Sequence, residues 1–199
     1  MKKLLVIIDN GHGIDTKGKC SPDKSLYEWQ WARDIAGKLM VELLKNGIEY
    51  YQLVPEDYDV PLKERVRRAN KVAADAKKMG YECILISLHV DAAGGDGKWH
   101  NASGWSVRVS PKASAKSKIL AQSLYAQAKV KKLQGNRCVP KEEYWVQNLY
   151  ICNNTSCPAV LTENLFQDNK EDVKYLLSEE GKRNIVELHL QGIINYMNI

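Results

Sequence analysis

Two histidines and two carboxylates stand out because their types and predicted placement suit hydrolytic chemistry. His12 and His89 each follow a short apolar run, and Glu163 ends a third such run. Glu28 lies near the start of the first predicted helix. Two histidine nitrogens and one carboxylate oxygen form a common catalytic zinc shell with a fourth position open, and a second carboxylate can serve as general base. The residue types therefore favour a zinc-dependent hydrolase, with the roles of the two carboxylates still open.

Alternating strands and helices must position these side chains. The predicted strands cover residues 4–9, 48–54, 83–88, 104–110, 150–152 and 159–162, and the predicted helices cover 26–45, 61–79, 111–132 and a last helical region from 168 towards 197. Such repeats are typical of a single α/β domain whose mostly parallel central sheet has helices on both faces. Ligand sites of these sheets lie beyond the carboxyl ends of the strands. We therefore expect His12, His89 and Glu163 to converge at one edge, with Glu28 beside them.

The composition excludes two classes of protein. The chain has 199 residues, of which 44% are hydrophobic and 27% charged, and its mean hydropathy is −0.42. No apolar run approaches the ~20 residues of a transmembrane helix, and the hydrophobic content is too high for a disordered chain. We expect one catalytic domain over residues 1–199. Five cysteines without a C-x-x-C pattern suit synthesis in a reduced compartment.

One segment carries much of the positive charge. The net charge is +5, and between Pro111 and Lys141 there are eight basic residues and no acidic one. They are Lys112, Lys116, Lys118, Lys129, Lys131, Lys132, Arg137 and Lys141. A solvated helix face is one interpretation, and attraction to a polyanion such as nucleic acid or an anionic cell wall is the other. Because no zinc-finger or RNP pattern accompanies the segment, we expect no nucleic-acid partner.

The N-terminus shows no secretion signal. Met1, Lys2 and Lys3 precede an apolar run, but the run is only five residues long and lacks a small-residue cleavage site. We therefore expect a protein that is made in the cytoplasm. We also expect it not to associate with a membrane and to be a monomer.

Four motifs occur in the same order as in a known enzyme family. They are Asp9-Asn10-Gly11-His12-Gly13, Glu28, Ser87-Leu88-His89-Val90-Asp91-Ala92 and Pro158-Ala159-Val160-Leu161-Thr162-Glu163, and the stretch from Asp59 to Asn70 also matches the entry to that family's second helix. From about residue 4 to its end, the chain resembles the zinc-dependent N-acetylmuramoyl-L-alanine amidases of the amidase type 3 family. The resemblance implies that His12, Glu28 and His89 bind Zn²⁺ and that Glu163 is the catalytic carboxylate. It also implies hydrolysis of the amide between N-acetylmuramic acid and L-alanine, with peptidoglycan as the partner.

Two neighbours of the predicted site are candidates for substrate binding. Asp91 follows His89 by two residues, where the resembled family usually has asparagine, and Asn164 follows Glu163 directly. The carboxylate of Asp91 would add negative charge near the metal or favour a cationic stem peptide. A solvated loop position is the other interpretation of Asp91.

The sequence is also compatible with two other functions. A related zinc peptidase would use the same shell to cut within the stem peptide, and a peptidoglycan-binding module would keep the fold without catalysis. An enzyme without a signal peptide that acts on the cell wall, in the periplasm or outside the cell, fits a phage or prophage endolysin, and equally a spore or mobile-element enzyme.

Overall fold

The computed structural model describes residues 3–199; Met1 and Lys2, part of the basic start considered above, lie outside the described residues. The strands are β1 (Leu4–Asn10), β2 (Glu49–Gln52), β3 (Glu82–Asp91), β4 (Ser106–Val109), β5 (Trp145–Val146) and β6 (Ala159–Phe166). The helices are α1 (Glu28–Lys45), α2 (Leu62–Lys78), α3 (Ala115–Val130), α4 (Tyr150–Asn154), α5 (Lys170–Leu177) and α6 (Glu179–Met197).

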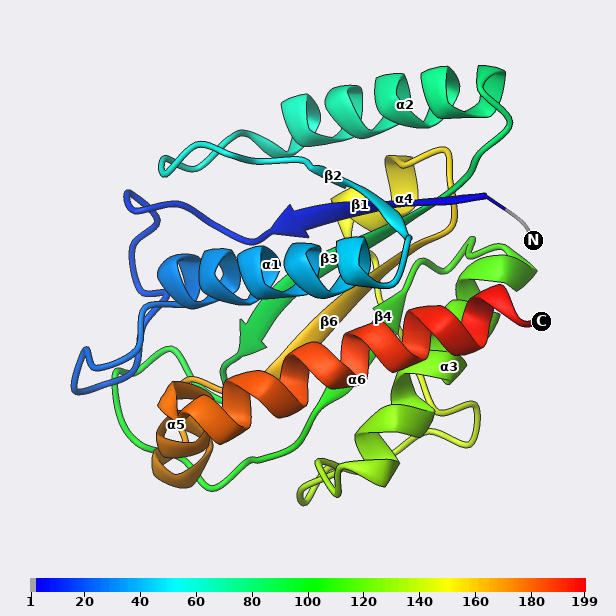
Figure 1. The fold of residues 1–199 in the computed structure, drawn as a ribbon. Helices are drawn as coiled ribbons and strands as arrows, with labels where there is room; N and C mark the ends of the chain where they lie inside the picture. The colour runs from blue at the N-terminus through cyan, green and yellow to red at the C-terminus, as the bar shows by residue number, and fades with distance from the viewer. Residues whose placement is uncertain (1–2) are drawn as a thin grey trace.

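The strands form one mixed sheet in the order β2-β1-β3-β6-β4-β5 (Figure 1). β2, β1, β3 and β6 run parallel to one another, whereas β4 is antiparallel to β6 and parallel to β5. The prediction of a single α/β domain with a mostly parallel sheet is therefore confirmed.

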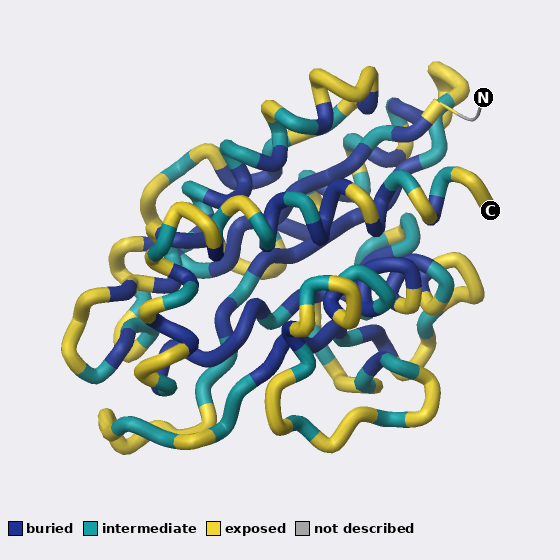
Figure 2. Tube along the Cα trace, turned by 60° about the horizontal axis from the view of Figure 1, so that its bottom comes forward, coloured by how far each residue is buried: buried dark blue, intermediate teal, exposed yellow. Residues whose placement is uncertain are grey.

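Two apolar cores sandwich the sheet, because successive strand side chains point to opposite faces. Val6, Ile8 and Ile86 belong to the core that contains residues of α1, α3 and α6. Ile7 and Leu85 belong to the other core, which contains residues of α2 and α4. The buried strands thus run through the middle of the molecule, between helices whose outer faces are exposed (Figure 2).

The predicted strand at residues 150–152 is wrong, because this segment forms the short helix α4. A three-residue apolar run fits a buried helix turn as well as a strand. Here the side chains of Asn154 and Thr155 donate to the carbonyls of Tyr150 and Ile151, which closes the turn.

Two other boundaries differ from the prediction. β6 continues to Phe166, well past Thr162. The last helical region is two helices, because the Ser178 hydroxyl accepts from the amide of Gly181 and starts α6 anew. The side chain of Asn169 caps α5 by accepting from the amides of Glu171 and Asp172.

The basic segment 111–141 forms α3 and the loop after it. Half of its eight cations pair with acids from elsewhere in the fold: Lys116 with Glu82, Lys129 with Glu143, Lys131 with Glu187 and Arg137 with Asp91. The surface that this segment forms therefore has less uncompensated positive charge than the sequence indicates. Among the described residues, no helix is long and apolar enough to span a bilayer.

Candidate active site

Three of the predicted residues meet near the carboxyl ends of β1 and β3. His12 Nε2 lies 3.4 Å from Glu28 Oε2, and His89 Nδ1 lies 2.9 Å from Glu28 Oε1. One nitrogen from each histidine and one oxygen of Glu28 all lie within 4.8 Å of one another. The two imidazole rings stand edge to face, with their centroids 4.9 Å apart. The structure thus brings together the three residues proposed as metal ligands.

A strained loop points His12 into this site. His12 has a φ of +59°, in the left-handed region that non-glycine residues rarely adopt. A Cβ atom on Gly11 would lie 2.4 Å from the His89 ring, and one on Gly13 would lie 2.0 Å from the backbone nitrogen of Asp59. Both glycines are therefore required for the close approach of this loop to its neighbours.

Two arginines hold the same loop through its backbone. The carbonyl of His12 accepts from Nη2 of Arg33 at 3.1 Å and from Nη2 of Arg65 at 3.3 Å. Arg65 is buried and also donates to Asp9 Oδ1 at 2.7 Å, while Asp9 Oδ2 accepts from the Ser87 hydroxyl at 2.5 Å. Sequence reasoning gave no role to these supports, although an arginine on the buried side of a helix was the available signal.

Glu28 is the buried centre of the three residues. Its side chain is 1% exposed, and its Oε1 accepts from the amide of Val90 at 3.0 Å. Burial alone would raise the pKa of Glu28, but the hydrogen bond from His89 and the nearby positive charges outweigh it and lower that pKa. Its Oε2 is buried without a hydrogen-bond partner among the described residues. Its charged neighbours are His12 Nε2 at 3.4 Å and Lys19 Nζ at 4.0 Å. A buried carboxylate oxygen without a hydrogen bond is suited to a metal ion.

The two histidines have opposite pKa shifts. Burial lowers the pKa of His12 to about 4, despite the charge of Glu28. Burial also acts to lower the pKa of His89, but the hydrogen bond and charge of Glu28 outweigh it and raise that pKa. The lowered pKa favours a neutral His12, and a neutral imidazole has the free lone pair that a metal requires. The set of two imidazole nitrogens and one carboxylate oxygen fits zinc, and Glu28 Oε2 has no hydrogen bond that a metal would displace.

Glu163 lies opposite His89 in the β3–β6 ladder, outside the three-residue group. Its side chain is 13% exposed, and its Oε2 is buried without a hydrogen-bond partner among the described residues. Burial raises the pKa of Glu163 to about 7, against the opposing charge of His89. A carboxyl group that titrates near neutral pH can both accept and return a proton.

The two residues predicted to bind substrate have other contacts. Asn164 is fully buried; it accepts from Trp105 Nε1 at 2.7 Å and donates to the His89 carbonyl at 2.9 Å. Asn164 has no exposed surface and braces the strand end that carries His89, so its contact with substrate stays a prediction. Asp91 pairs with the guanidinium groups of Arg108 and Arg137 and is not a freely solvated loop residue.

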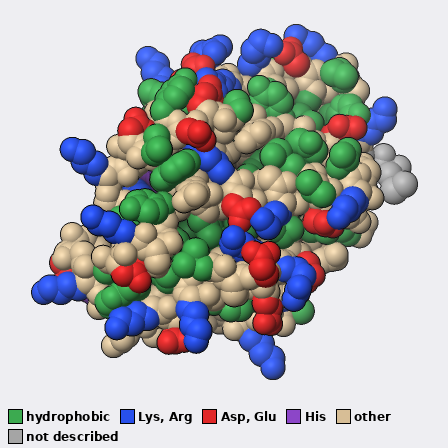
Figure 3. Space-filling view, turned by 60° about the vertical axis from the view of Figure 1, so that its left-hand side comes forward, with side chains coloured by type: hydrophobic (Ala, Val, Ile, Leu, Met, Phe, Trp, Pro, Cys, Tyr) green, Lys and Arg blue, Asp and Glu red, His purple; other side chains and the backbone are tan. Residues whose placement is uncertain are grey.

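A cavity of about 460 Å³ adjoins the histidines. It lies between the start of α2 and α4, with His12 and His89 in its wall and with the exposed side chains of Leu62 and Tyr150 also lining it. Figure 3 shows the face at which the strands end, and only a little histidine surface is visible there. The side chains of His12 and His89 are 19% and 17% exposed.

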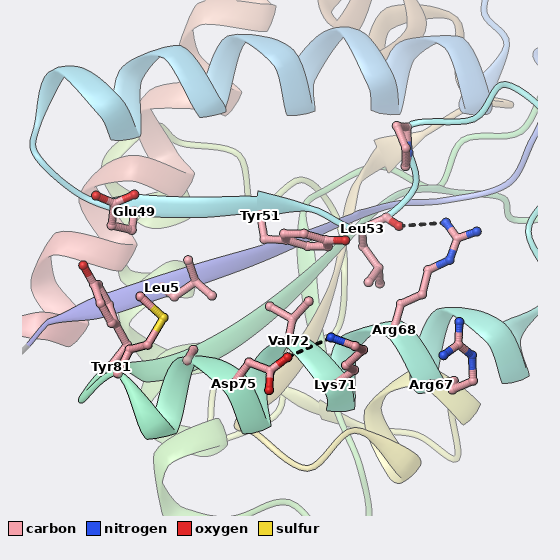
Figure 4. A pocket seen from close by; sticks show the side chains of 13 residues that line it. Leu5, Glu49, Tyr51, Leu53, Arg67, Arg68, Lys71, Val72, Asp75 and Tyr81 are labelled. Carbon is pink, nitrogen blue, oxygen red and sulfur yellow. Dashed lines mark hydrogen bonds and ion pairs between the residues drawn. The ribbon is translucent and has the colours of Figure 1, made fainter.

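A larger groove of about 780 Å³ lies elsewhere, between β2 and α2 (Figure 4). Its wall combines apolar side chains such as Leu5, Leu53 and Val72 with charged ones such as Lys71, which pairs with Asp75 across 2.8 Å. None of the candidate site residues lines it, so its size does not make it the active site.

A family model and a phage protein match nearly the whole chain in sequence. A family model described as N-acetylmuramoyl-L-alanine amidase matches residues 6–195. The endolysin of Bacillus phage SPP1 is 28% identical over 202 residues, which cover 98% of this chain but only 66% of the phage protein.

Solved structures share the fold over its full length. The N-acetylmuramoyl-L-alanine amidase from Clostridium difficile 630 superposes with a TM-score of 0.83 at 26% identity, covering 100% of this chain and 98% of that one. The catalytic domain of CwlV, an N-acetylmuramoyl-L-alanine amidase from Bacillus (Paenibacillus) polymyxa var. colistinus, superposes with a TM-score of 0.79 at 24% identity, covering 100% and 99%. The resemblance seen in the sequence motifs is therefore confirmed, and the chain belongs to the N-acetylmuramoyl-L-alanine amidase family of amidase type 3.

Proposed function

We propose that this protein hydrolyses the amide bond between N-acetylmuramic acid and L-alanine in peptidoglycan, with Zn²⁺ as its cofactor. The observation that carries the proposal is the group of His12, Glu28 and His89 beside the partly buried carboxyl of Glu163. Family membership supports the choice of bond, and the nitrogen and oxygen donors support the choice of metal.

The proposed roles follow from the surroundings of each side chain. His12, Glu28 and His89 hold the metal, and the strained loop and its arginines keep His12 in place. When bound, zinc would act as a Lewis acid towards the attacking water and the amide carbonyl. Glu163 takes the proton from the attacking water and returns it to the leaving amine, which its pKa of about 7 permits.

Analysis of the digestion products tests the choice of bond. Purified sacculi are incubated with the zinc-loaded protein, and the soluble products are identified by mass spectrometry. An amidase releases intact stem peptides that begin with L-alanine and leaves glycan chains without peptides. Fragments cut within the stem peptide would show a peptidase instead, and binding without soluble products would show a non-catalytic wall-binding module.

We also propose that the protein acts at the cell wall as an endolysin. The support is the similarity to the SPP1 endolysin over 98% of this chain. Co-expression with a pore-forming phage holin tests this proposal. Rapid lysis that needs both proteins would support it, whereas lysis by the amidase alone would show another route to the wall.

A further inference from the structure

Arg108 reaches towards Glu163 from the neighbouring strand. Its Nη2 lies 2.5 Å from Asp91 Oδ2, its Nη1 donates to Oε1 of Gln147, and its Nε lies 3.8 Å from Glu163 Oε1. The Nε atom is buried without a hydrogen-bond partner among the described residues. The guanidinium is therefore held at two corners, with its third corner facing the carboxylate of Glu163.

Asp91 anchors this arrangement from the end of β3. Besides Arg108, its Oδ2 pairs with Arg137, and its Oδ1 accepts from the amide of Ala92 at 2.9 Å. Arg137 is itself fixed, because its guanidinium lies 4.4 Å from the centre of the Phe166 ring and its Nε donates to the carbonyl of Gly104. Asp91 is therefore held from two sides and holds Arg108 in turn.

Glu163 needs a nearby positive charge that leaves its carboxylate oxygens free of a full hydrogen bond. The negative charges of Asp91 and Glu28 disfavour the ionised form of Glu163, and the positive charge of Arg108 opposes them. At 3.8 Å, Arg108 attracts Glu163 Oε1 without making a full hydrogen bond, so the carboxylate is oriented but remains available for proton transfer.

We propose that Arg108, held by Asp91 and Gln147, is a positioning residue that orients the carboxylate of Glu163 for proton transfer. The inference rests on the proposed role of Glu163. It assigns to Asp91 a supporting task within the protein in place of a contact with substrate. It also explains why a carboxylate is tolerated at residue 91, beside the metal site: two arginines compensate its charge.

Substitution with chemical rescue tests this role. In Arg108→Ala, we expect kcat to fall about 10- to 100-fold, a part of the loss usual for removing a general base, with KM, zinc content and Tm close to the parent protein. Guanidinium chloride at tens of millimolar, far below denaturing concentrations, should restore kcat several-fold by filling the vacated space. Arg108→Lys keeps the charge but not the forked geometry, so its kcat should lie between those of the parent protein and the alanine variant.

Two further variants separate the possible outcomes. Arg67→Ala removes an exposed arginine of α2 and should neither lower kcat nor respond to guanidinium. Glu163→Gln should lose about 10²–10⁴-fold in turnover, with or without guanidinium. That loss in Glu163→Gln beside a fully active Arg108→Ala would overturn the role of Arg108 alone. An active Glu163→Gln would overturn both that role and the proposed role of Glu163. Loss of zinc or a large fall in Tm in Arg108→Ala, without rescue, would show a purely structural arginine.

Discussion

Arg65 and Asp9 form a fully buried ion pair beneath the site, with 2.7 Å between Nη1 and Oδ1. Arg65 comes from α2 and Asp9 from β1, so the pair joins two elements at the point where the His12 loop begins. The same guanidinium donates to the carbonyls of Asn10 and His12. The position of a proposed metal ligand thus depends on a charge pair that contributes no atom to the proposed ligand set.

Breaking this pair should cost both stability and metal binding. Arg65→Met leaves the carboxylate of Asp9 buried and uncompensated, and we expect the free energy of unfolding to fall by about 3–5 kcal/mol. Chemical denaturation measures the loss. Adding Asp9→Asn to Arg65→Met should recover part of it, and the exposed Arg67→Ala should change stability by less than about 0.5 kcal/mol. A stability loss no larger than that of Arg67→Ala would show that the pair is dispensable.

Removing either histidine should remove the metal. His12→Ala and His89→Ala each leave two of the three proposed ligands, so we expect sub-stoichiometric zinc by elemental analysis and no amidase activity. A chelator should inactivate the parent protein, and added zinc should restore it. His100→Ala is the matched control, because His100 lies on a loop and pairs with Asp96. Full activity in excess chelator would contradict the proposed cofactor.

Glu163→Gln should separate chemistry from metal binding. The amide keeps the size of the side chain but cannot accept the proton, so turnover should fall by about 10²–10⁴-fold. Zinc content and Tm should stay close to those of the parent protein, because Glu163 lies outside the three-residue group. Glu171→Gln, at an exposed position in the first turn of α5, should retain full turnover. Loss of zinc in Glu163→Gln would make Glu163 a ligand instead of a base.

The buried His189 should make the protein sensitive to acid. Its Nδ1 donates to the carbonyl of Ile185 and its Nε2 accepts from the Thr162 hydroxyl. Burial lowers the pKa of His189 from 6.5 to about 4. Between pH 6.5 and pH 4, His189 is therefore mostly protonated in the unfolded chain and mostly neutral in the folded protein. The stabilising contribution of the neutral ring is complete above pH 6.5 and decreases as the pH falls towards 4, by a total of about 3 kcal/mol.

Denaturation curves at several pH values measure this contribution. His189→Gln cannot be protonated, so the pH-dependent part assigned to His189 should disappear, although other acidic groups still titrate. The comparison is the difference in slope between the two proteins from pH 6.5 to pH 4. Equal slopes would show that His189 is not responsible.

The sequence alone determined the fold class and the meeting of the main polar residues. Apolar runs that alternate with helical periodicity predicted the parallel part of the sheet, and the carboxyl ends of parallel strands necessarily share one edge. His12, His89 and Glu163 each follow such a run, so their convergence followed from local pattern plus topology. The structure explains the glycines on either side of His12, because a Cβ atom at Gly11 or Gly13 would clash with its neighbours.

Only the tertiary structure decided the contacts that hold these residues in place. The segment at 150–152 is helical because its neighbours close a turn, and β5 is a two-residue strand too short to show a pattern. Arg65, Arg108 and Asp91 lie far apart in the sequence from their partners at Asp9, Glu163 and Arg137. The sequence pattern around a charged side chain does not predict its partner, because an ion pair depends on the distance in space and not on the separation along the chain. The fold brings each charge to the one that compensates it, and so decides which carboxylate remains free for chemistry.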